Sequence, residues 1–123
     1  MKIGRLLTGI GGVILLLTGL GHGAKLGQLD AMIQAGGMKA PLDAILRGCW
    51  LTLSGEMVAV GVLAIVAIGI DKGARIVLIC AAVMVFNVGV LLHFVGPFIG
   101  VYLTATVAVL FLAGGLSQLK QAA

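Results

Sequence analysis

The sequence predicts an all-α integral membrane protein, an antiparallel four-helix bundle, and three observations lead to that fold class. Hydrophobic residues make up 61% of the 123 residues and charged residues only 10%, and the mean hydropathy is +1.25. A water-soluble domain of this length needs far more polar surface. The apolar residues also fall into four runs long enough to cross a bilayer, and none of the runs shows the alternation of a barrel strand.

The four runs define the predicted spans of a single transmembrane domain over residues 1–123. They cover residues 6–22, 42–70, 76–94 and 97–116. Lys2 and Arg5 precede the first run, as basic residues also precede the apolar part of a signal peptide, but we expect a true first helix. The links at 71–73 and 95–97 are short, so each joins two antiparallel helices.

The link between the first two spans, residues 24–41, is the only long one. Apolar residues recur in it at helical spacing: Leu26, Leu29 and Ile33. Gly36 and Gly37 would end such a helix, and Pro41 suits the first turn of the next span. We therefore expect a short amphipathic helix that lies in the outer membrane interface.

The basic residues predict the orientation of the chain. Five of them fall on the side that holds both termini: Lys2, Arg5, Lys72, Arg75 and Lys120. Only three fall on the other side: Lys25, Lys39 and Arg47. This bias predicts both termini in the cytoplasm, with the chain in the cytoplasmic (inner) membrane. The basic residues are scattered at segment ends, so the net charge of +4 indicates no nucleic-acid partner.

Glu56 is the one acidic residue deep inside a predicted span. A rise of ~1.5 Å per residue places it about 13 Å beyond Arg47, near the bilayer centre, and Asn87 of the third span reaches a similar depth. At about 100° per residue, Arg47 and Glu56 point to nearly opposite faces. We therefore expect Glu56 to pair with Asn87. The pair is either a structural clamp or a carboxyl site for a proton or ligand.

The two histidines are predicted to lie at one level near the outer ends of their helices. His22 belongs to a stripe of mostly small or polar residues that should face the bundle: Thr8, Gly11, Leu15, Thr18 and His22. His22 and His93 either cap helix ends or ligate a haem, for which neighbouring glycines leave room. Trp50 and Tyr102 are either anchors at the membrane interface or contacts to a ligand.

The sequence lacks the residues that disulfide formation, phosphate binding and nucleophilic catalysis require. Cys49 lies toward the outer end of the second span and Cys80 toward the inner end of the third, so they are too far apart for a disulfide. No glycine-rich segment ends in Lys-Ser or Lys-Thr, as a phosphate loop would. Ser54 and Glu56 point apart, so they cannot join His22 in a catalytic triad. The sequence gives no support for nucleophilic catalysis, and we do not expect a self-sufficient enzyme.

The layout of the chain resembles the DoxX-like group of small bacterial membrane proteins. The resemblance rests on four short spans, a link ending in Met38-Lys-Ala-Pro41, a Trp and a Glu on the second span, and the charged hairpin Asp71-Lys-Gly-Ala-Arg75. It implies a four-helix bundle that serves a thiol or quinone redox system as a subunit. The chain has no Cys-x-x-Cys pair, so direct thiol chemistry is not expected. Small multidrug exporters also have four spans, but their essential acid is on the first helix, where this chain has none.

Three functional hypotheses follow from these residues. The first is a binding or accessory protein that holds a lipid-like or quinone-like molecule in the bundle. Its predicted ligand-binding residues are Glu56, Asn87, His22, His93, Trp50 and Tyr102. The alternatives are a haem electron-transfer protein with His22 and His93 as ligands, and a proton-coupled exporter with Glu56 as the exchangeable site. The expected partners are membrane lipid and either a second copy or other membrane subunits.

Overall fold

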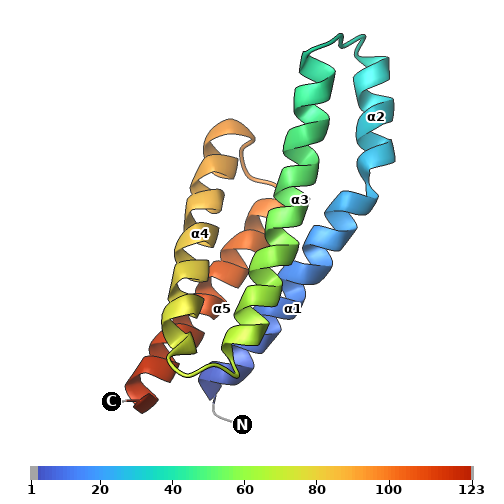
Figure 1. Cartoon of the computed structure of the whole chain (residues 1–123). Coiled ribbons are helices and arrows are strands. Elements are labelled where there is room, and N and C mark those ends of the chain that lie inside the picture. The colour runs from blue at the N-terminus through green and yellow to red at the C-terminus, as the bar shows by residue number, and fades with distance from the viewer. Residues whose placement is uncertain (1–2, 123) are drawn as a thin grey trace.

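A computed structural model describes residues 3–122, and its helices form an antiparallel bundle (Figure 1). The helices are α1 (Ile3–Ala24), α2 (Leu26–Ala35), α3 (Leu42–Ala67), α4 (Gly73–Phe94) and α5 (Ile99–Ala122). All but α2 are long and apolar enough to cross a membrane. The predicted fold class, four long apolar helices with one short helix between the first two, is confirmed.

The four long helices form a ring in which every neighbouring pair is antiparallel. α1 packs against α3 and α5, and α4 packs against α5 and, less extensively, against α3. Both ends of the described chain lie at the same end of the bundle as the 68–72 connection (Figure 1). We call this the terminal end, and the opposite end, with the 95–98 connection, the distal end.

The core is filled by large apolar side chains. The bulkiest fully buried ones are Phe111, Leu15, Met84, Val77 and Val107. They come from all the long helices except α3, which adds Met57, Ala64 and Ala67 at exposures of 4% or less. The interior between the helices is therefore occupied by the protein itself.

Glycines let α1 approach both of its neighbours closely. A Cβ on Gly61 of α3 would lie 2.8 Å from the Gly12 carbonyl oxygen, and a Cβ on Gly4 would lie 2.8 Å from the Gly114 carbonyl oxygen of α5. Both distances are too short for any side chain. The predicted small-residue stripe does face the bundle at Thr8, where the exposed fraction is zero, and lipid-embedded helices use such stripes to bring backbones together.

The short helix α2 exists as predicted but is oriented differently. Figure 1 shows it alongside the first turns of α3, close to the direction in which α1 ends, rather than across the bundle. Ile33 is only 4% exposed, and Arg47 Nε of α3 lies 2.7 Å from Asp30 Oδ1 of α2. This apolar contact and ion pair hold α2 upright against α3, and Gly37, with a φ of +63°, begins the turn back.

α3 begins at Leu42 and α4 ends at Phe94, as predicted, and the other ends of the long helices differ from the predicted spans by two to six residues. α1 begins at Ile3 and α5 continues to Ala122, because polar residues near these ends bond across the bundle: Gln118 Nε2 donates to Thr8 Oγ1 at 2.9 Å. α3 ends early, at Ala67. Its carbonyl lies so close to Gly73 that no side chain fits there, which makes the turn into α4 tight.

Candidate functional site

Glu56 of α3 and Asn87 of α4 form the polar contact between these two helices. Asn87 Nδ2 donates to Glu56 Oε1 at 2.8 Å, so the predicted pairing is confirmed. Both side chains are partly buried. Each lies in a row of partly buried apolar residues one turn away along its helix: Leu53 and Val60 on α3, Val83 and Leu91 on α4. The pair is thus a polar contact with apolar residues on both sides of it along the interface.

The depth of the pair follows from helix geometry. Glu56 lies 11 residues before the end of α3, about 16 Å along the helix axis from the terminal end. The hydrocarbon core of a bilayer is about 30 Å thick. The pair therefore lies near the middle of the span, where a charged or unpaired polar group is most costly.

The pair keeps hydrogen-bonding capacity that the described chain does not use. Glu56 Oε2 and Asn87 Oδ1 have no hydrogen-bond partner within residues 3–122, whereas no buried side-chain polar atom in that range lacks one. Both oxygens are therefore accessible at the surface of the bundle. In hydrocarbon an unsatisfied polar group costs several kcal/mol, so these two atoms favour an occupant that bonds to them.

The α3–α4 interface also changes character at this level. Every buried residue of α4 lies between Gly73 and Met84, on the terminal side of Asn87. Beyond the pair, Leu92 is 47% exposed and Phe94 78% exposed. Within residues 3–122, the Glu56–Asn87 bond is the one side-chain hydrogen bond between α3 and α4, and no residue of α4 on its distal side is buried.

A second polar cluster joins α1 to α3 near the distal end. The rings of His22 and Trp50 stack with centroids 3.8 Å apart and an interplanar angle of 21°. Trp50 Nε1 donates to the His22 carbonyl oxygen at 2.8 Å, and His22 Nδ1 lies 2.8 Å from Ser54 Oγ. Ser54 Oγ in turn donates to the Trp50 carbonyl oxygen. Five polar groups of two helices are hydrogen-bonded within one cluster.

The hydrogen bonds of this cluster assign the tautomer of His22. Because the Ser54 hydroxyl proton is directed to the Trp50 carbonyl, Ser54 Oγ accepts from His22 Nδ1–H. The His22 carbonyl, in the last turn of α1, accepts both from Trp50 and from the Lys25 backbone N–H, the latter at 3.2 Å. The cluster therefore holds the end of α1 against α3.

The other predicted site residues lie in different surroundings from Glu56 and Asn87. His93 is exposed and makes an edge contact with Phe94, and Tyr102 is 60% exposed on α5. α1 and α4, which carry the two histidines, stand diagonally across the ring. The structure thus divides the six predicted residues between one polar pair, one stacked cluster and two exposed side chains, and the two histidines do not meet across a common space.

The positions of Arg47 and of the two cysteines agree with those predicted from helix geometry. Arg47 points away from Glu56 and pairs with Asp30 and, at 3.6 Å, with Asp43. Cys49 is exposed and Cys80 is buried, and both are free. Within residues 3–122 no group of three or more His, Cys, Asp or Glu side chains is placed to hold a metal ion.

Two polar networks were missed by sequence reasoning. The stacked cluster could have been found, because Trp50 and Ser54 are one turn apart on the face of α3 opposite Glu56, and His22 lies at the same level of an antiparallel neighbour. The contact of Gln118 with Thr8 had no such signal, since Gln118 lies beyond the predicted end of the last span.

Comparisons with known proteins identify no relative of this chain. No family model, no curated protein and no solved structure matches the chain. The resemblance in layout to DoxX-like proteins stays a prediction, and the functional argument depends on the geometry alone.

Proposed function

We propose that the protein is a small integral membrane binding protein whose Glu56–Asn87 pair receives the polar group of a lipid-soluble molecule from the bilayer. The observation that carries the proposal is the pair itself: a hydrogen-bonded carboxyl and amide near mid-membrane that keep two accessible oxygens without partners. The packed core leaves the α3–α4 surface, rather than the bundle interior, as the place for the ligand.

The chemistry of the pair defines the class of ligand. In its neutral form, Glu56 offers an O–H donor at Oε2, and Asn87 offers an acceptor at Oδ1 and a second N–H. A quinone or quinol, with carbonyl or hydroxyl groups on a flat ring and an apolar tail, fits both. Phe86, exposed one residue before Asn87, supplies an aromatic surface at the same level.

This ligand class suggests the setting of the protein. We place it in the inner membrane of a bacterium as an accessory subunit of a quinone-linked redox system, with both termini in the cytoplasm. The orientation is supported by basic residues at the terminal end of the bundle: Arg5, Lys72, Arg75 and Lys120. Lys2, which belongs to the same count, lies outside the described residues. A DoxX-like relationship is part of the same proposal.

Photoaffinity labelling tests the proposed site. The full chain, reconstituted in phosphatidylcholine nanodiscs, would be irradiated with an azido-quinone and the labelled peptides mapped by mass spectrometry. We expect label on α3 and α4 around Glu56 and Asn87. Glu56→Leu removes the carboxyl and should lower the labelling affinity roughly tenfold, the size expected for a hydrogen bond in an apolar site.

Thr106→Val is the matched control. Thr106 is exposed on α5 and its hydroxyl bonds only to the Tyr102 carbonyl within the same helix, so labelling should be unchanged. Label spread evenly over all lipid-facing helices, or an equal affinity in wild type and Glu56→Leu, would rule out this site.

A further inference from the structure

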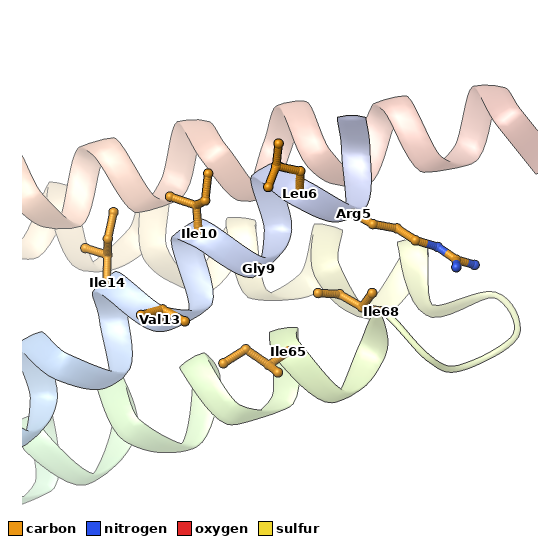
Figure 2. Close-up of a pocket in the computed structure, with 8 residues that line it drawn as sticks. All are labelled: Arg5, Leu6, Gly9, Ile10, Val13, Ile14, Ile65 and Ile68. Atoms are coloured by element: carbon orange, nitrogen blue, oxygen red, sulfur yellow. The ribbon is translucent and has the colours of Figure 1, made fainter. Parts of the chain in front are cut away.

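A second feature is an apolar groove that α1 and α3 leave near the terminal end (Figure 2), in the interface next to the one that holds the Glu56–Asn87 pair. Its volume is about 420 Å³, within the range of small-molecule sites. Seven of its eight lining residues are aliphatic or glycine: Leu6, Gly9, Ile10, Val13, Ile14, Ile65 and Ile68. The eighth is Arg5. An occupant must therefore be hydrocarbon along nearly its whole length.

Gly9 gives the groove its depth. A Cβ at this position would be 3.5 Å from Ile68 Cδ1, so the absence of a side chain leaves space without any backbone contact that requires glycine. Figure 2 shows Gly9 between the flanking α1 side chains and the two isoleucines of α3. The close approaches at Gly4 and Gly12 differ, because there a side chain would strike backbone.

Arg5 provides a cation at one end of this hydrocarbon surface. It is exposed and has no ion-pair partner within residues 3–122. Figure 2 shows its side chain extending from the terminal end of the groove. Lys72, Arg75 and Lys120 belong to the same end of the bundle, against Asp71 as the one acid. This end attracts an anionic group, and a basic residue near a membrane surface contributes about 1 kcal/mol to the binding of anionic lipid.

The length of the groove matches one leaflet. Arg5 and Ile14 are nine residues apart, about 13 Å along the axis of α1, and half of a hydrocarbon core of about 30 Å is about 15 Å. A phosphate at Arg5 would thus stand at headgroup level with its acyl chain running beside Gly9 toward the bilayer centre.

We infer that this groove binds one anionic phospholipid, with the phosphate on Arg5 and an acyl chain in the hollow at Gly9. The site is separate from the Glu56–Asn87 pair and does not depend on the function proposed for it. The inference requires only that the groove select by headgroup charge and by chain space, which ordinary boundary lipid does not do.

Native mass spectrometry of the full chain tests this inference. The protein would be released from nanodiscs of phosphatidylcholine with a minority of phosphatidylglycerol, and the retained lipid counted. The wild type should retain one phosphatidylglycerol per chain in preference to phosphatidylcholine. Arg5→Gln should reduce that preference about fivefold, the equivalent of one basic residue, and Gly9→Leu, which fills the hollow, should abolish retention.

Two matched variants serve as controls. Gly21→Leu makes the same substitution on α1 where a Cβ meets nothing within 4 Å, and Lys39→Gln removes a charge from the other end of the bundle, in the turn that follows α2. Both should retain lipid as the wild type does. Equal retention of the two lipids by the wild type, unchanged retention in Gly9→Leu, or a dimer that carries no lipid would each overturn the inference. Arg5 is exposed, so Arg5→Gln keeps the test valid should Gly9→Leu fold poorly.

Discussion

The indole N–H of Trp50 donates to the carbonyl oxygen of His22 at 2.8 Å while the two rings stack. Trp50 of α3 thereby contacts both the backbone at the end of α1 and the imidazole ring of His22. The junction between α1 and α3 thus combines a hydrogen bond with a stacking contact, and these two contributions can be separated by substitution.

Trp50→Phe keeps an aromatic ring but removes the donor. The free energy of unfolding should fall by about 1 kcal/mol, the typical net value of a hydrogen bond. Unfolding in mixed micelles with increasing SDS, followed by far-UV circular dichroism, measures this. Tyr102→Phe is the control, because the exposed Tyr102 hydroxyl makes no hydrogen bond within the described chain. Equal stability of the two variants would show that the bond contributes nothing.

Gly61→Ala should destabilise the bundle strongly. The added Cβ would meet Gly12 carbonyl oxygen at 2.8 Å and Leu16 backbone nitrogen at 2.9 Å, so α1 and α3 must move apart, at a cost of roughly 1–3 kcal/mol. Gly48→Ala on the same helix has open space around its Cβ and should leave the SDS midpoint unchanged or slightly higher, because alanine favours helix. A similar loss in both variants would contradict the close approach.

A double-mutant cycle measures the coupling between Glu56 and Asn87. Glu56→Leu and Asn87→Leu each leave one polar partner alone, whereas the double variant leaves none and should be nearly as stable as the wild type. The coupling energy should lie between about 0.6 and 1.7 kcal/mol, the average and the maximum for hydrogen bonds between membrane helices. Additive effects of the two single substitutions would mean that the pair is not bonded in the membrane.

Arg47→Gln should release α2 without unfolding the bundle. The ion pair with Asp30 is partly exposed, with side-chain exposures of 39% and 37%, so it contributes at most about 1 kcal/mol. Hydrogen exchange in residues 26–35 should therefore rise several-fold while exchange in α1 stays the same. Lys39→Gln, in the turn that follows α2, is the control for loss of charge. Unchanged exchange in α2 would assign its docking to Ile33 alone.

The elements of the fold that could be predicted are those fixed by hydropathy and helical period. Lipid satisfies no backbone hydrogen bonds, so four apolar runs must be helices, and short links make neighbours antiparallel. Phase and depth then paired Glu56 with Asn87 and separated Glu56 from Arg47. Both inferences need only two numbers, the rise and the angle per residue, and both agree with the structure.

The features that could not be predicted depend on which helices are neighbours in the ring. Four antiparallel helices can be arranged in more than one order, and the sequence does not say that α1 and α4 are diagonal. Because α1 and α4 are diagonal, His22 and His93 lie at a similar depth but not in the same helix–helix interface. The direction of α2 could not be predicted either, since its packing against α3 depends on an ion pair between residues 17 positions apart.

The glycine contacts of α1 constrain the order in which the protein assembles. α1 touches α3 through Gly12 and α5 through Gly4, and α5 is the last of these helices to leave the ribosome. The half of that surface that faces α5 has no α5 to pack against until α5 has been synthesised. Closure of the ring is thus a late step of assembly, and an insertase or chaperone that shields α1 before then would contact a glycine-lined surface.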